Sequence, residues 1–85
     1  MLNIQHVIKK SKEVKKVMVH SAWQANPTQY AIVVAYKSGD KCYMLDVKYG
    51  VKPEKHDIIG LDKNDNITAI YKVDDVEELK FYLDK

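Results

Sequence analysis

Residues 29–49 read QYAIVVAYKSGDKCYMLDVKY, and this stretch decides the fold class. Two runs rich in β-branched and aromatic residues flank Ser38-Gly39-Asp40, a pattern that predicts a β-hairpin. A two-residue turn at Ser38-Gly39 or Gly39-Asp40 pairs even positions with odd ones. One face then carries Tyr30, Ile32, Val34, Tyr36, Tyr43, Leu45, Val47 and Tyr49. The opposite face carries Ala31, Val33, Ala35, Cys42, Met44, Asp46 and Lys48. A three-residue loop would instead oppose Lys37 to Lys41, so the two-residue turn is favoured.

Further strands are predicted on both sides of this hairpin. Upstream, residues 16–24 alternate with a period of two, and Asn26-Pro27 ends the run because proline lacks the donor that an inner strand requires. Downstream, a polar loop precedes a short apolar strand at residues 58–61. After a turn, residues 67–73 alternate again. The sequence therefore predicts five strands.

The two ends of the sequence have the pattern of helices. Over residues 3–12, Asn3 is a suitable N-cap and apolar residues recur at helical spacing. Near the other end, Asp74 and Glu77 match a capping box and precede an apolar stripe. The expected fold is α+β, with an antiparallel five-stranded twisted sheet or half-barrel, an N-terminal and a C-terminal helix, and the order α-β-β-β-β-β-α.

Length and composition indicate a single small domain spanning residues 1–85. Hydrophobic residues make up 46% of the chain and the formal net charge is +2, so a modest core can form. At this size burial exceeds chain entropy only slightly, and a partner interface is a natural supplement. We expect another protein as the partner, while formation of a homodimer stays open.

Several functional classes are disfavoured by the sequence. The longest apolar run, Ala31 to Tyr36, is far shorter than the roughly 20 residues that cross a bilayer, and the first residues lack the pattern of a signal peptide. We therefore expect a cytoplasmic protein without a membrane partner. The lone Cys42 cannot form an internal disulfide, and the scattered glycines form no phosphate cradle. No spacing brings a histidine to Cys42, so we expect no catalytic, metal or cofactor site and retain an enzyme or metal protein only as a third hypothesis.

All 14 basic residues are lysines, and arginine is absent. Arginine supplies the planar fork that reads phosphate and guanine bidentately, so its absence argues against specific nucleic-acid recognition. Together with the many Asn, Ile and Tyr residues, it indicates A- and T-rich codons, as in a low-GC bacterium or its phage. Nucleic-acid binding without sequence preference is the alternative function, and its candidate contacts are Lys9, Lys10, Lys12, Lys15 and Lys16.

The aromatic residues favour a protein interface. Six tyrosines and one tryptophan against one phenylalanine give large side chains with polar tips, which are typical of surfaces that bind partners. The candidate interface residues are Trp23, Tyr30, Tyr36, Tyr43 and Tyr49. The leading hypothesis is a non-enzymatic binding protein that occludes a partner's surface, such as an anti-defence or immunity-type inhibitor from a phage or mobile element.

Overall fold

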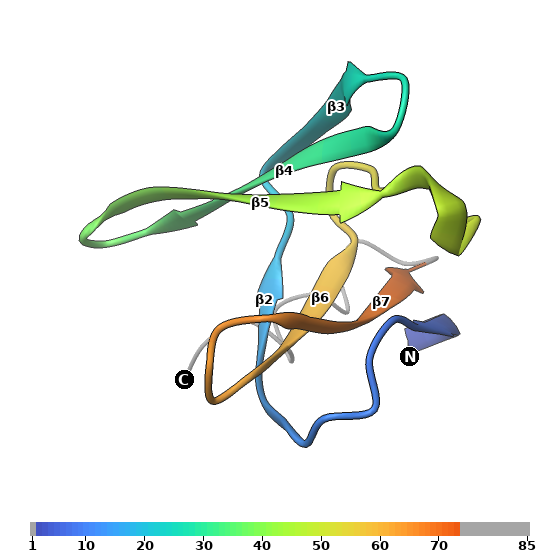
Figure 1. The fold of residues 1–85 in the computed structure, drawn as a ribbon. Coiled ribbons are helices and arrows are strands. Elements are labelled where there is room, and N and C mark those ends of the chain that lie inside the picture. Colours follow the sequence, from blue (N-terminus) through green and yellow to red (C-terminus); the bar gives the residue numbers. More distant parts are fainter. Residues whose placement is uncertain (1, 74–85) are drawn as a thin grey trace.

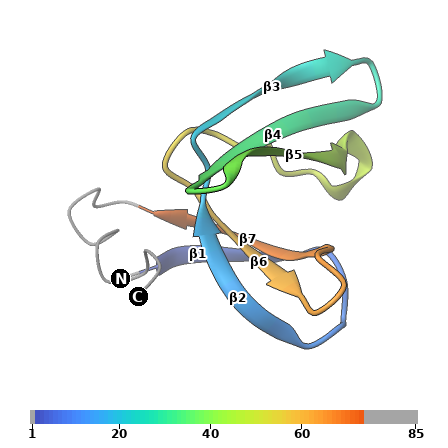
Figure 2. The ribbon, with the colours of Figure 1, turned by 90° about the vertical axis from the view of Figure 1, so that its left-hand side faces the viewer.

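The computed structural model describes residues 2–73, which form two antiparallel β-sheets (Figure 1). The strands are β1 (Leu2–Val7), β2 (Glu13–Met18), β3 (Ser21–Asn26), β4 (Gln29–Tyr36), β5 (Gly39–Asp46), β6 (Ile58–Asp62) and β7 (Ile67–Val73), and the 3₁₀ helix η1 (Val47–Tyr49) follows β5. One sheet has four strands in the order β1-β7-β6-β2, and the other has three in the order β3-β4-β5. Figure 2 shows these sheets as two layers, with the chain crossing between them after β2 and again after β5.

The central hairpin is confirmed, with its turn placed slightly earlier than expected. Tyr36 pairs with Gly39, so Lys37 and Ser38 form a two-residue turn. This register still pairs even positions with odd ones, and it brings Ile32 opposite Tyr43 on one face of the sheet. The predicted division of the hairpin into two faces therefore holds within β4 and β5. After Asp46 the chain turns into η1, although the N–H of its first residue, Val47, still bonds to the carbonyl of Thr28.

The core lies between the two sheets. From the three-stranded sheet it receives Ile32, Val34, Tyr43 and Leu45, and from the four-stranded sheet Ile59, Leu61, Ile67 and Ile70. Val19 and Val51, which lie in the connections between the sheets, complete it. These β-branched and leucine side chains pack well on pleated surfaces, and their burial removes apolar area from water on both sheets at once.

The predicted strand at residues 16–24 is divided into β2 and β3 by Val19 and His20. Val19 is fully buried, and its N–H donates to the carbonyl oxygen of Asp57 at 2.7 Å. Its own carbonyl accepts from the N–H of His56 at 3.0 Å, while the N–H of His20 donates to Val33 of β4 at 2.8 Å. Val19 is thus bonded to the loop before β6 and His20 to the other sheet. A continuous alternating pattern gives no sign of this break.

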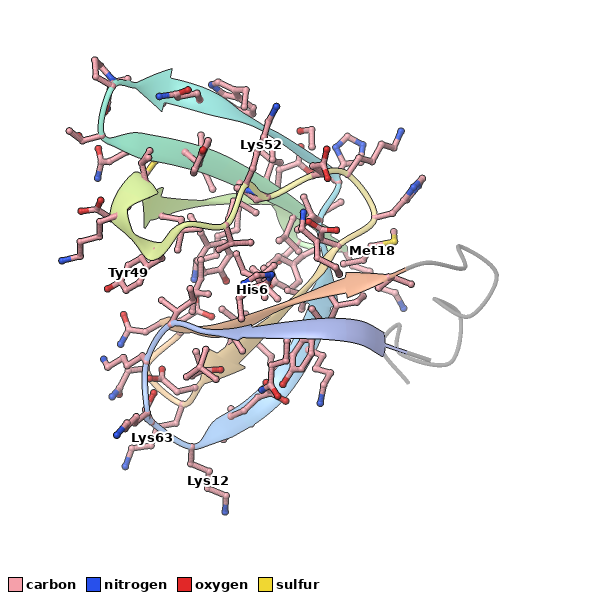
Figure 3. The ribbon with its side chains drawn as sticks, turned by 90° about the vertical axis from the view of Figure 1, so that its right-hand side faces the viewer. His6, Lys12, Met18, Tyr49, Lys52 and Lys63 are labelled. Atoms are coloured by element: carbon pink, nitrogen blue, oxygen red, sulfur yellow. The ribbon has the colours of Figure 1, made fainter. Side chains whose placement is uncertain are left out.

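The expected N-terminal helix is wrong, because residues 2–7 form the edge strand β1. In the ladder with β7, His6 pairs with Ile70 and Val7 with Ala69. His6 points from β1 toward the space between the layers (Figure 3). A helix of about ten residues is marginal on its own, whereas pairing with a distant strand satisfies the backbone along the whole segment. The helical spacing of the apolar residues was therefore not decisive.

The expected fold class is corrected accordingly. Residues 2–73 form seven strands in two sheets with no α-helix, in place of a five-stranded sheet with an N-terminal helix. The helix predicted from Asp74 onward lies outside the described residues. The predicted turn at Asn26-Pro27 is confirmed, as are the loop at residues 50–57 and the last two strands.

The loop at residues 50–57 is tied to the four-stranded sheet by a partly buried ion pair. Lys72 of β7 donates to Asp57 Oδ2 at 2.7 Å and to the carbonyl of Lys52 at 2.6 Å. The N–H of Glu54 donates to the same Asp57 oxygen at 2.8 Å. Burial nevertheless raises the pKa of Asp57, because desolvation outweighs these favourable contacts. The loop is held in the position from which its backbone reaches Val19.

On the other face of the four-stranded sheet, Gly60 leaves room for the side chain of Glu13. The Glu13 carboxylate accepts a hydrogen bond of 2.6 Å from the Tyr71 hydroxyl and pairs with Lys16 Nζ at 2.6 Å. A Cβ at position 60 would collide with this carboxylate and lie 3.0 Å from Thr68 Oγ1. Burial, with the neighbouring Glu13, raises the pKa of Tyr71 to about 12, so its hydroxyl remains a donor.

We predict that Gly60→Ala lowers the free energy of unfolding by about 1–2 kcal/mol, because the methyl group displaces the Glu13 carboxylate from Tyr71 and Lys16. Denaturant unfolding measures the loss. In a Glu13→Ala background the obstacle is gone, so the same change at Gly60 should cost less. Equal costs in the two backgrounds would show that the carboxylate is not what requires glycine.

Candidate protein interface

The outward face of the three-stranded sheet carries two large apolar side chains in one cross-strand row. Trp23 of β3 pairs with Ala31 of β4, and Ala31 pairs with Met44 of β5. Trp23 is 50% exposed and Met44 46% exposed, while Ala31 between them is only 2% exposed. Side chains of one row lie on one face, opposite the core residues Ile32 and Tyr43. The row therefore presents an aromatic ring and a thioether to solvent side by side.

The adjoining positions extend this surface without adding charge. Ser21, Val33 and Cys42 form the next row, with Cys42 exposed and Val33 half-buried. Ala35 of β4 is also exposed. We call this set the outer face, and it consists of Ser21, Trp23, Ala31, Val33, Ala35, Cys42 and Met44.

Two acidic residues bracket the outer face along β5. By register, Asp40 lies opposite Ala35 at one end, and Asp46 lies opposite Gln29 at the other. Asp40 is exposed, while Asp46 is half-buried and accepts from the N–H of Lys48 at 2.8 Å. The outer face thus has an apolar centre with a negative charge at each end of β5.

Of the predicted interface residues, only Trp23 lies on this face. Tyr43 is buried in the core, and Tyr30 and Tyr36 are half-buried against it. Tyr49 is exposed but belongs to η1, away from the β3-β4-β5 ladders (Figure 3). Sequence reasoning missed Met44 as a contact residue. The two-face pattern of the hairpin could have indicated Met44, because the residues between Asp40 and Asp46 on that face, Cys42 and Met44, are uncharged.

The tyrosine hydroxyls instead join the two sheets through Asp65. The hydroxyls of Tyr36 and Tyr43 lie 3.2 Å apart, and Tyr43 donates to Asp65 Oδ1 at 3.0 Å. Lys41 forms an ion pair with Asp65, and Lys15 Nζ lies 4.0 Å from it. Burial raises the pKa of Tyr43. Its hydroxyl therefore stays protonated at neutral pH, and the cluster fits a structural role.

The predicted lysine cluster is split by the structure. Lys15 pairs with Leu61 and Lys16 with Gly60, so these neighbours point to opposite faces of β2. Lys16 is engaged with Glu13 at 2.6 Å, and Lys9 Nζ lies 4.0 Å from Asp62 Oδ2. The exposed Lys10 and Lys12 belong to the loop between β1 and β2, where Lys12 points away from the protein (Figure 3). The five lysines do not form one continuous basic track.

The surface formed by residues 2–73 includes two open hollows. One, of about 770 Å³, lies between β2 and the β4–β5 turn and is lined by residues that include Lys16, Met18 and Tyr36. The other, of about 820 Å³, lies beside β5 and the turn after β6, and its lining includes Lys41 and Asp65. In residues 2–73 no three His, Cys, Asp or Glu side chains are grouped so as to hold a metal ion. The same range includes no helix with the length and apolarity needed to cross a membrane.

Comparison of the chain with protein-family models, curated proteins and solved structures finds no significant match.

Asp62 joins two segments: the loop between β1 and β2, which contains Lys9, and the turn that follows β6. Its carboxylate accepts from Ser11 Oγ at 2.7 Å and from the backbone N–H groups of Asn64 and Asn66, each at 2.9 Å. The bond from Asn66, followed by that from Ser11, lowers the pKa of Asp62 below its ordinary value of 3.8. The ionised carboxylate is therefore the form that the folded state prefers.

We predict that Asp62→Asn destabilises the protein at neutral pH and that this difference from wild type shrinks in acid. A lowered pKa contributes stability above the unfolded value of 3.8, and the contribution is lost as the pH falls through 3.8 toward the folded pKa. Denaturant unfolding of both proteins across the acid range measures the difference. A constant difference at all pH values would contradict the assignment.

Proposed function

We propose that this chain is a non-enzymatic binding protein that recognises another protein through the outer face. The observation that carries the proposal is the row formed by Trp23, Ala31 and Met44, in which two large apolar side chains stay half-exposed on the face opposite the core. A cluster of exposed apolar side chains on a folded protein usually marks a site that binds a partner.

The residue types of the outer face suit protein recognition. Tryptophan dominates the binding energy of many interfaces, and methionine adapts its unbranched side chain to the shape of a partner. The small Ala31 separates these two side chains in the row, so the indole and the thioether are the groups that meet a partner there. Asp40 and Asp46 at its ends favour a partner whose apolar patch is flanked by basic residues, since complementary charge speeds the encounter.

The mechanism that follows is occlusion. A rigid sheet that covers the working surface of its target blocks that surface without chemistry, as an anti-defence or immunity-type inhibitor from a phage or mobile element would. Nucleic-acid binding through Lys9 to Lys16 stays a prediction, and the carboxylates beside Lys9, Lys15 and Lys16 count against it.

We predict that Trp23→Ala and Met44→Glu each reduce capture of a protein partner from native lysate at least about tenfold, because they remove anchors from the centre of the contact. Val14 of β2, which is 54% exposed on the other sheet, gives the matched control Val14→Glu. This control should capture the partner as wild type does. Capture is measured on immobilised protein by mass spectrometry, after nuclease treatment.

Undiminished capture by both outer-face variants, with their fold verified by circular dichroism, would contradict the proposal. A captured fraction that disappears after nuclease treatment, and that weakens steeply with salt, would favour the lysine-based alternative instead.

A further inference from the structure

The strand β3 has an uncharged edge. It pairs with β4 on one side, and within residues 2–73 no strand pairs with its other side. Its sequence, SAWQAN, contains neither charge nor proline, whereas β2 and β5, two of the other edge strands within residues 2–73, carry lysines. Charges and prolines are the usual devices that prevent edge strands from pairing with other chains. The edge of β3 is therefore open to a further strand.

Along an antiparallel strand, successive residues direct their backbone N–H and C=O groups to opposite sides, and this alternation identifies which groups of β3 face the open edge. The N–H of Val47 donates to the carbonyl of Thr28 at 2.9 Å, which continues the β4–β5 register by one pair. Bonded pairs alternate along an antiparallel ladder, so even positions of β4 bond to β5 and odd positions bond to β3. Trp23, opposite Ala31, is thus bonded to β4.

The backbone groups of the two neighbours of Trp23 point in the direction opposite to those of Trp23. Because backbone groups alternate along a strand, the N–H and C=O of Ala22 and Gln24 point away from β4, toward the open edge. The His20 N–H donates to the Val33 carbonyl at 2.8 Å. Val33 is an odd position of β4, so this bond agrees with the assignment of odd positions to the side that faces β3. Two donors and two acceptors therefore lie along the edge, with Trp23 between them.

We propose that this chain forms a homodimer in which β3 pairs antiparallel with β3 of a second copy, about a two-fold axis at Trp23. Ala22 of each copy then lies opposite Gln24 of the other, and all four outward backbone groups of each copy are paired. The two three-stranded sheets become one six-stranded sheet. The two Trp23 residues form a non-hydrogen-bonded pair, with Cα atoms about 4.5 Å apart and both indoles on the outer face.

The second copy fits this edge for reasons of charge and symmetry. A two-fold axis brings identical residues together, which is unfavourable for charged strands and favourable for SAWQAN. At the centre it opposes tryptophan to tryptophan, and aromatic cross-strand pairs stabilise antiparallel strands. The inference does not depend on the proposed partner protein, since it uses the backbone edge of β3 and leaves Met44 of β5 uncovered.

The test uses the full chain and its single tryptophan. Sedimentation equilibrium should show a monomer–dimer equilibrium that shifts with concentration. In parallel, far-ultraviolet circular dichroism should show an exciton couplet from the paired indoles that grows with the dimer fraction. A chain with one tryptophan cannot form an indole pair by itself, and coupling among its own tyrosines does not grow with the dimer fraction.

Gln24→Pro removes an N–H that faces the open edge and leaves the β3–β4 bonds in place, so it should abolish both the dimer and the couplet. Gln24→Thr keeps the N–H and should dimerise as wild type does. If Gln24→Pro does not fold, Gln24→Lys introduces repulsion across the two-fold axis and should weaken the dimer most at low salt.

Three outcomes would overturn the proposal. They are a wild-type chain that is monomeric at every concentration, a dimer without the indole couplet, and a dimer that persists in folded Gln24→Pro. Met44→Glu separates this inference from the proposed function, because it should abolish partner capture and leave the dimer unchanged.

Discussion

The arrangement of both sheets depends on the backbone of Val19. With its N–H and C=O bonded to Asp57 and His56, this residue is held on the loop before β6, and the next residue is bonded to β4. The chain must therefore leave the four-stranded sheet at this point and enter the three-stranded one. The side chain of Val19 is fully buried where the two layers meet. The ion pair of Lys72 with Asp57 supports the same loop from β7, so a polar contact and an apolar one hold the crossing together.

The position of the core decides which large residues remain available for recognition. The inward face of β4 and β5 takes Tyr30, Tyr36 and Tyr43, and the Tyr43 hydroxyl, which lies beside that of Tyr36, donates to Asp65. The outward face keeps Trp23 and Met44, which the fold does not need for its core. Exposure of these two side chains is unfavourable in water unless a partner covers them. In the proposed binding mode, stability and recognition therefore depend on opposite faces of the same three strands.

The sequence predicted the local features of the fold and missed the distant ones. The hairpin, the turn at Asn26-Pro27 and the face pattern of residues 30–45 follow from neighbours along the chain, and the structure confirms them. The pairing of β1 with β7 and the break at Val19 depend on residues far along the chain, from 37 positions away for His56 and Val19 to 71 for Val73 and Leu2, which no local period reports. For the candidate site, Trp23 was identified from composition. Composition does not indicate Met44, because it favours the aromatic residues, and the core takes up Tyr43 with Tyr30 and Tyr36 packed against it.

The order of strands in the two sheets also implies an order of folding. The three-stranded sheet is a meander of neighbouring strands joined by two-residue turns, so its contacts close short loops at little entropic cost. The four-stranded sheet joins Leu2 to Val73, and its ladder with β1 cannot form on the ribosome until nearly all of residues 2–73 have emerged. Contacts of such sequence separation form slowly. We therefore expect the meander to form first during synthesis, with the outer face complete before the sheet that supports it has closed.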